Sequence, residues 1–287
     1  MTHSVAVIAD SAASLPPALA KKWGVSIVAL QVIVDDHAYD EGEQIAAKEV
    51  LDRLLAGSRV STSQPSIAAF EAAYRRAEDA GATEVVAVAI SGEMSGTANA
   101  ARAAAAHVGI PVEVVDTHTL AMATGFAAVA AAALAAQGGD SAQVAAMARQ
   151  VSGSALCVFT LDSLEYLKRG GRVSAAAAAI GNALSMRPVM AIRDGNVAVL
   201  ERVRTTARAR AAMLERVDAS IATMSRPAVA MMALGEEQYG NDAALLVESR
   251  HPELCMLVRT PVSAVLSAHT GPGTLAAVVV DLPDIVH

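Results

Sequence analysis

Residues 83–116, TEVVAVAISGEMSGTANAARAAAAHVGIPVEVVD, contain the pattern that decides the fold. The apolar run 83–90 predicts a buried strand, the alanine-rich run 95–109 predicts a helix, and residues 110–116 predict a second strand. Strands that are apolar almost throughout and alternate with helices are typical of a parallel sheet with helices on both faces. The segment therefore predicts a strand–helix–strand unit of an α/β protein.

The same alternation extends toward the N-terminus from this unit. Strands are expected over residues 4–10 and 25–36, and helices over 15–24, 45–57, 65–81 and Met122–Ala136. Pro16 and Pro17 stand near the start of one of these helices and Gly24 at its end, as is usual for helix boundaries. Residues 1–154 therefore predict an N-terminal lobe with a mostly parallel sheet.

The pattern changes after about residue 153. Two strand-like runs flank Asp194 and Gly195, which is a strong signal for a β-hairpin. Further strands and helices alternate after them up to the C-terminus. We expect residues 155–287 to form a second α/β lobe with a mixed sheet. No long linker separates the lobes, so we expect them to be in close contact.

Composition and charge exclude several classes of function. The 287 residues contain only 3% aromatic side chains and carry a formal net charge of -7, which argues against a nucleic-acid-binding protein. The most apolar run, residues 124–139, is too short and too rich in alanine for a membrane span. The N-terminus has no basic residue before its apolar run, so no signal peptide is expected. Cys157 and Cys255 form no metal motif, and we expect both as buried thiols in a cytoplasmic protein.

Four polar loops are expected at helix starts, over residues 9–14, 60–66, 90–99 and 115–121. In doubly wound sheets, ligands bind at the loops that follow the carboxyl ends of the strands. Free N–H groups at helix starts favour anions, and hydroxyl groups add hydrogen bonds. Serine, threonine and aspartate are also ordinary helix caps, so a single loop can equally be structural. Convergence of several loops on one sheet edge favours a ligand site.

Other motifs argue against a serine hydrolase and a phosphate-binding loop, and they add two candidate residues. Residues 91–96, SGEMSG, do not match the Gly-x-Ser-x-Gly turn of serine hydrolases, and residues 271–275, GPGTL, lack the end of a phosphate-binding loop. Arg172 follows Gly170-Gly171 and can pair with a carboxylate in a bidentate fork, or can be an ordinary surface arginine. His269 is expected in a glycine-rich loop, where it is either a ligand-binding or a structural histidine.

Together these motifs resemble the DegV family of bacterial fatty-acid-binding proteins. The resemblance rests on TSQPS at residues 62–66, LKRGGRVS at 167–174 and HTGPGTL at 269–275, in that order. It implies two α/β lobes with one long-chain fatty acid between them. It also implies a non-catalytic, lipid-carrying subunit of bacterial fatty acid kinase. In that system a separate ATP-binding subunit phosphorylates the bound carboxyl group to an acyl phosphate.

The resemblance also implies a set of ligand-binding residues, with no catalytic residue, metal or cofactor besides the fatty acid itself. These residues are Thr62, Ser63, Ser95, Gly96 and His269 around the carboxylate, with Arg172 close by. The family often has two serines where this chain has Ser91-Gly92, so a hydroxyl is missing from that loop.

A fatty acid also needs an apolar tunnel, in which each buried methylene group contributes about 0.8 kcal/mol. The small side chains of residues 123–136 and 175–184 are candidates for the lining. Two alternatives stay open at this stage. One is a kinase or phosphotransferase for a small sugar- or dihydroxyacetone-like substrate, which would need a nucleotide site. The other is a carrier of a different apolar acid.

Overall fold

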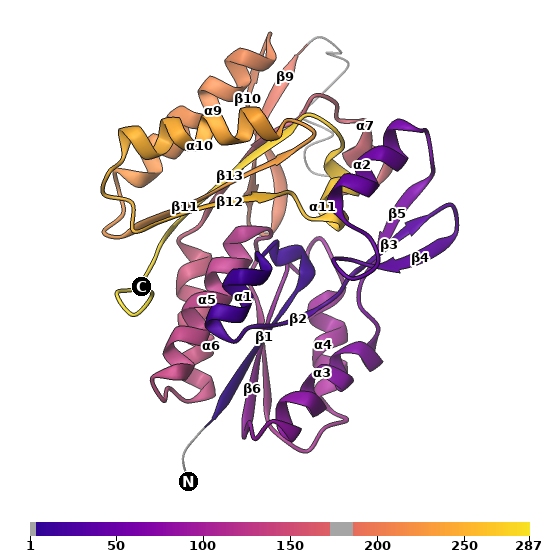
Figure 1. Ribbon diagram of the computed structural model, residues 1–287, viewed down its shortest axis with the longest axis vertical. Helices are drawn as coiled ribbons and strands as arrows, with labels where there is room; N and C mark the ends of the chain where they lie inside the picture. Colours follow the sequence, from indigo (N-terminus) through magenta and orange to yellow (C-terminus); the bar gives the residue numbers. More distant parts are fainter. Residues whose placement is uncertain (1–3, 173–185) are drawn as a thin grey trace.

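The computed structural model describes residues 4–172 and 186–287 of the chain. Figure 1 shows them as two lobes, one above the other, with the N-terminus at the free end of the lower lobe. The candidate tunnel-lining residues 175–184 lie outside the described residues.

The lower lobe is built around a four-stranded parallel sheet with the strand order β2-β1-β6-β7. The strands are β1 (Val5–Asp10), β2 (Ser26–Val28), β6 (Glu84–Ala89) and β7 (Val112–Asp116). On one face lie α1 (Pro17–Trp23), α5 (Met122–Ala136) and α6 (Ser141–Gly153), and on the other α3 (Ile67–Asp79) and α4 (Thr97–Ala105) (Figure 1). The prediction of a parallel sheet with helices on both faces is confirmed.

The upper lobe contains a six-stranded mixed sheet with the order β10-β9-β8-β13-β11-β12. The strands are β8 (Leu156–Thr160), β9 (Arg187–Arg193), β10 (Asn196–Val203), β11 (Pro227–Leu234), β12 (Met256–Pro261) and β13 (Thr274–Asp281). β11 and β12 pair in parallel, and the other pairs are antiparallel. The helices α9 (Thr206–Ile221) and α10 (Glu237–Arg250) pack on the face away from the lower lobe (Figure 1). The hairpin predicted at Asp194 and Gly195 joins β9 to β10.

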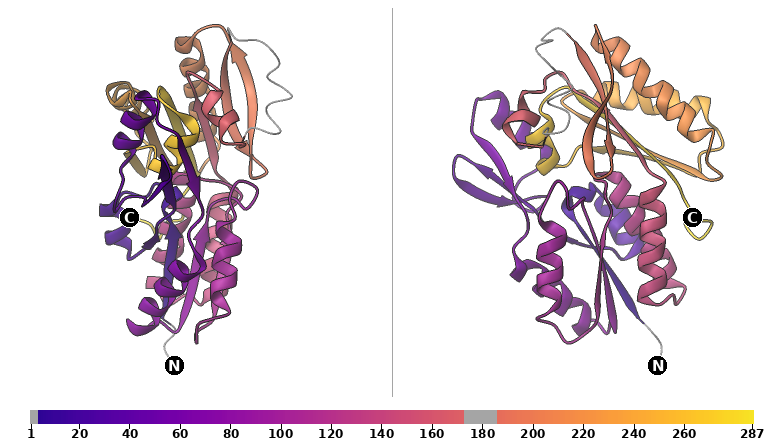
Figure 2. Two further views of the ribbon diagram at one scale, coloured as in Figure 1. Left: turned by 90° about the vertical axis from the view of Figure 1, so that its right-hand side faces the viewer. Right: turned by 180° about the vertical axis from the view of Figure 1, so that it is seen from behind.

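A small antiparallel sheet with the order β4-β3-β5 stands beside both lobes (Figure 2). Its strands are β3 (Gln31–Val34), β4 (His37–Asp40) and β5 (Val60–Ser63). It packs against α2 (Ala47–Leu55) and α11 (Ala264–Thr270), and α7 (Glu165–Arg169) packs against α11. The expectation of one strand over residues 25–36 was wrong. The chain leaves the parallel sheet after Val28, where the backbone N–H of Leu30 donates to Ser11 Oγ and its carbonyl accepts from Glu41 N.

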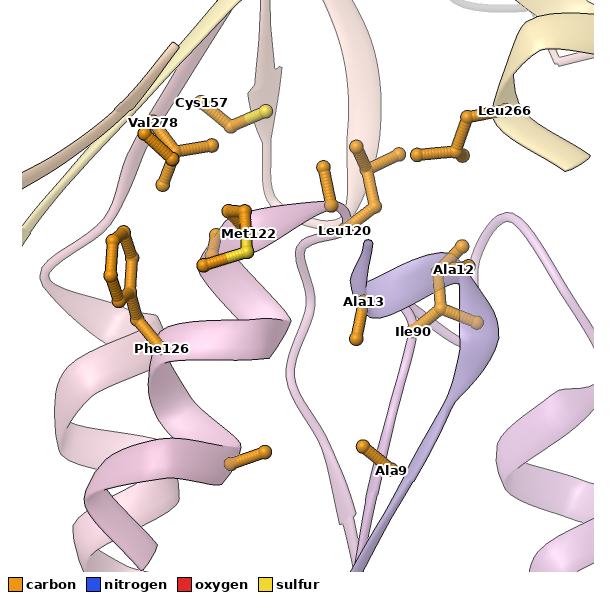
Figure 3. Close-up of a cluster of buried hydrophobic side chains, with 14 of the residues drawn as sticks. Ala9, Ala12, Ala13, Ile90, Leu120, Met122, Phe126, Cys157, Leu266 and Val278 are labelled. Carbon is orange, nitrogen blue, oxygen red and sulfur yellow. The ribbon is translucent and has the colours of Figure 1, made fainter. Parts of the chain in front are cut away.

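The two lobes share one hydrophobic core. Phe126 and Met122 of α5 lie against Val278 of β13 and Cys157 of β8, as Figure 3 shows.

The boundary predicted between residues 154 and 155 matches the change from one large sheet to the other in the chain, and it stays a prediction. Within the described residues, no helix combines the length and the apolar character needed to span a bilayer. Cys255 is exposed, so the expectation that both cysteines are buried was wrong for it.

Candidate functional site

Most of the residues predicted for the ligand site line one pocket, which lies between the two lobes and the small sheet. Its volume is about 840 Å³, including the part that is open to solvent. Most of the wall is apolar and comes from both lobes. The apolar lining consists of Leu30, Ile90, Met94, Leu120, Ala121, Cys157, Phe159, Leu167, Ile192, Val197, Met232, Val262, Val265, Leu266 and Ala276. All of these except the half-buried Met94 are buried. Figure 3 shows several of them between the lobes.

Five of the six residues predicted for the site line this same pocket. They are Thr62, Ser63, Ser95, Arg172 and His269. Arg172 is exposed, whereas the three hydroxyl residues and His269 are half-buried. These five residues therefore lie nearer the surface than most of the apolar wall. Thr270 and Thr274 also line the pocket, and Thr274 is buried. The assignment of the five predicted residues to carboxylate binding stays a prediction.

Thr62 and His269 form the central contact of the polar end. Thr62 Oγ1 and His269 Nε2 are 2.8 Å apart and share a hydrogen bond. Burial lowers the pKa of His269 to about 4, and the nearby charge of Arg172 adds to this effect. The imidazole is therefore neutral at neutral pH. Its other ring nitrogen, Nδ1, is buried and has no hydrogen-bond partner among the described residues.

The remaining hydroxyl and guanidinium groups are held by short local contacts. Ser95 Oγ lies 2.8 Å from Thr97 Oγ1, and Ser63 Oγ donates to Gln31 Oε1 over 3.2 Å. Arg172 donates from Nη1 to the carbonyl of Gly170 over 2.6 Å and from Nε to that of Met94 over 3.3 Å. Among the described residues, Arg172 pairs with no acidic side chain, and its guanidinium lines the pocket.

Gly96 does not line the pocket, but it makes room for a residue that does. A Cβ atom at Gly96 would overlap Oε1 of Gln64. Gln64 is exposed and lines the polar end, although our sequence interpretation did not assign it to the site. Its place in TSQPS, between assigned hydroxyl residues and a helix start, was the available signal. A glutamine amide can both donate and accept hydrogen bonds there.

His269 does not lie in a loop, contrary to the sequence expectation. It stands in the last turn of α11, and the glycine-rich segment follows it. Gly271 ends the helix with φ of 71°, a conformation that favours glycine. The loop expected over residues 60–66 is also corrected, since Val60–Ser63 form strand β5.

Two of the four predicted polar loops contribute no hydroxyl or carboxylate group to the pocket. Asp10 is buried and accepts hydrogen bonds from the backbone N–H groups of Ala12 and Ile90. The loop after β7 supplies Leu120 and Ala121, which are apolar lining residues. Across the described ranges 4–172 and 186–287, no three histidine, cysteine or acidic side chains are grouped to hold a metal ion.

The chain matches a known family of proteins. The model of the DegV family, which is described as uncharacterised, matches residues 4–282. A DegV domain-containing protein of Streptomyces coelicolor is 39% identical over 281 residues, covering 97% of this chain and 99% of the relative. This chain belongs to the DegV family.

Solved structures of DegV proteins have the same fold. A structure described as fatty acid binding of a DegV family protein from Thermus thermophilus has a TM-score of 0.90 and 29% identity, covering 97% of this chain and 100% of the other. A second, described as DegV, a fatty acid binding protein from Bacillus subtilis, also has a TM-score of 0.90, with 24% identity and coverage of 97% and 99%. This DegV chain therefore has the family fold over nearly its whole length.

Proposed function

We propose that this DegV protein binds one long-chain fatty acid without catalysing a reaction on it, and that it presents the carboxyl group to a separate ATP-binding kinase subunit. The carboxylate lies at the polar end of the pocket, among Thr62, Ser63, Ser95 and His269. The tail lies along the buried apolar wall.

The division of the pocket into a polar mouth and an apolar interior is the observation that carries this proposal. Each methylene group buried there contributes about 0.8 kcal/mol, so the tail supplies most of the affinity. The fatty acid binding described for the Thermus thermophilus protein, which has the same fold, supports the choice of ligand.

Hydrogen-bond directions at the polar end fit a carboxylate. An imidazole proton on Nδ1 would be a buried donor without a partner among the described residues, which is costly. A proton on Nε2 instead donates to Thr62 Oγ1 across the 2.8 Å contact. The hydroxyl proton of Thr62 is then free to donate to the ligand. Arg172 contributes positive charge from the pocket mouth.

The polar end of the pocket lies near the surface, which favours phosphoryl transfer to the bound carboxylate from a partner subunit. An oxygen of the bound carboxylate attacks the γ-phosphorus of ATP held by the kinase subunit. The bond between that phosphorus and the bridging oxygen breaks, ADP leaves, and an acyl phosphate remains. This chain supplies the orientation of the carboxylate, and the kinase supplies the nucleotide.

Binding is tested by titrating the delipidated protein with palmitate and stearate in a calorimeter. We expect saturation at one ligand per chain, and Thr62→Val to weaken binding by about ten- to a hundredfold, because a hydrogen bond to a charged group contributes about 1.5–3 kcal/mol. Thr223→Val is the matched control, since its hydroxyl donates to the carbonyl of Ser220 away from the pocket. Equal affinity of both variants and wild type would contradict the proposed site.

The assignment of lipid binding to this chain and of phosphorylation to a separate kinase subunit is tested with ATP and magnesium. The loaded protein alone is expected to form no acyl phosphate, trapped as a hydroxamate, and to form it when the ATP-binding subunit of a bacterial fatty acid kinase is added. Acyl phosphate from the protein alone would contradict a non-catalytic role. Thermal stabilisation by ATP and magnesium without any lipid would favour the small-molecule kinase alternative.

A further inference from the structure

We propose that Glu41 is a positioning residue for the ligand site, because its carboxylate fastens α11 to the small sheet and so fixes His269 opposite Thr62. This inference rests on the proposed function for its effect on lipid binding. The geometric part concerns the protein without ligand.

Glu41 makes an unusual set of buried contacts for a carboxylate. The residue is 6% exposed. Its Oε1 accepts a hydrogen bond of 2.7 Å from the backbone N–H of Val265, in the first turn of α11. Its Oε2 accepts from the hydroxyl of Ser11, which also accepts from the backbone N–H of Leu30 over 2.9 Å. Both carboxylate oxygens are thus used within the protein.

Glu41 and Thr62 belong to the same small sheet. Glu41 directly follows β4, and its own N–H donates to the carbonyl of Leu30, the residue before β3. β3 pairs with β5, in which Thr62 is opposite Val32. The distance between Glu41 and Thr62 is therefore set by one continuous antiparallel sheet.

Helix α11 contacts this sheet at both of its ends. Val265 and His269 are four residues apart, so they lie on the same side of the helix, about 6 Å apart along its axis. Val265 is held by Glu41 and His269 by Thr62. α11 also packs against α2 and α7, but the hydrogen bonds of Val265 and His269 are the two that set its orientation relative to the small sheet. Loss of Glu41 therefore displaces His269, although the two residues do not touch.

Burial makes this carboxylate costly, which argues for a role that an apolar residue cannot fill. Burial raises the pKa of Glu41, although hydrogen bonds from Ser11 and from the start of α11 oppose the increase. A leucine would cover the same surface without the desolvation cost. It would have no acceptor to join Ser11 to the backbone of Val265. The carboxylate supplies two acceptors at the required spacing.

The test compares Glu41→Gln with Glu41→Leu and measures the pKa of His269 by NMR in the ligand-free protein, followed by palmitate affinity. Glutamine keeps an acceptor for Val265, and its amide N–H can donate to Ser11 Oγ, which reverses the direction of that hydrogen bond but still joins the two residues. The pKa of His269 therefore stays near 4, and the affinity changes less than threefold. Leucine frees α11, so the pKa of His269 moves upward as water reaches the ring, and the affinity falls at least tenfold. Glu41→Asp keeps the charge on a side chain that is shorter by one methylene group. We expect a smaller rise in the pKa of His269 and a smaller loss of palmitate affinity than in Glu41→Leu.

Asp140→Ala is the matched control, because Asp140 accepts a backbone hydrogen bond at the start of α6, outside the pocket. It is expected to lower stability without moving the pKa of His269 or the affinity. The proposal is overturned if Glu41→Leu, or Glu41→Asp where the leucine variant does not fold, retains both wild-type values. It is also overturned if Glu41→Gln is as damaging as Glu41→Leu. If the wild type binds no palmitate, the proposed function fails, and the pKa of His269 still tests the positioning role.

Discussion

At the scale of single residues, the contact between Thr62 and His269 joins segments 207 positions apart in the chain. The motifs that contain them were recognisable in the sequence, together with Ser63, Ser95 and Arg172. Their convergence on one pocket depends on the small sheet, which the sequence pattern did not reveal. Gln64 was missed because its one signal was its place in TSQPS, and the glutamine itself looks like an ordinary solvated loop residue.

The low pKa of His269 predicts a stability effect with a definite sign. The folded protein takes up this proton only near pH 4, whereas the unfolded chain takes it up near pH 6.5, so the unfolded state is favoured as pH falls through this window. The effect reaches about 3 kcal/mol at full protonation. We expect His269→Gln to lose less stability than wild type between pH 6.5 and 4, measured by urea unfolding.

His251 is the control for this experiment, because its pKa is shifted in the opposite direction. Burial opposes the shift, but hydrogen bonds to Asp218 and Glu253 raise the pKa of His251. Its stabilising contribution is present at low pH and is lost as pH rises through the folded pKa. His251→Gln should therefore lower the free energy of unfolding most at low pH. Parallel pH profiles for the two variants would contradict the assignment of His269 as a buried neutral residue.

At the scale of elements, the sequence predicted the strand–helix–strand units well, since apolar runs and helix ends are local signals. It failed where tertiary contacts decide the boundaries or the type of an element. Residues 25–36 are divided between two sheets because Leu30 is bound by Ser11 and Glu41, which are far from it in the chain. His269 lies in a helix of only 7 residues, too short for a clear periodic pattern.

The end of α11 gives a prediction at this scale. Gly271 has φ of 71°, and a Cβ atom there would overlap the ring of Tyr166. Gly57 has φ of 83° with open space around it. We expect Gly57→Ala to destabilise the protein by about 1 kcal/mol through backbone strain alone, and Gly271→Ala by at least about 2 kcal/mol through strain and overlap. Equal losses in urea unfolding would show that Tyr166 does not restrict this turn.

At the scale of the whole molecule, the two lobes are joined by a common core around α5. This core predicts that they unfold together. The chain has 1 tryptophan, Trp23 in α1, which reports on the lower lobe, while far-UV circular dichroism reports on both. We expect both signals to change at the same urea concentration. Separate transitions would show that the shared core does not couple the lobes.

Truncation of Phe126 tests the same coupling. Its fully buried ring lies against Val278 of the upper lobe (Figure 3). Phe126→Ala is expected to cost about 3–5 kcal/mol and to shift both signals together. A shift of the Trp23 signal alone would contradict the shared core.

Binding of a fatty acid is tested most directly by the mass of the protein purified without added lipid, measured under native and denaturing conditions. One long-chain fatty acid per chain is predicted as a mass difference that disappears on denaturation, and extraction would identify the acid. A native mass equal to that of the bare chain, with no fatty acid bound on titration, would contradict fatty-acid binding by this protein.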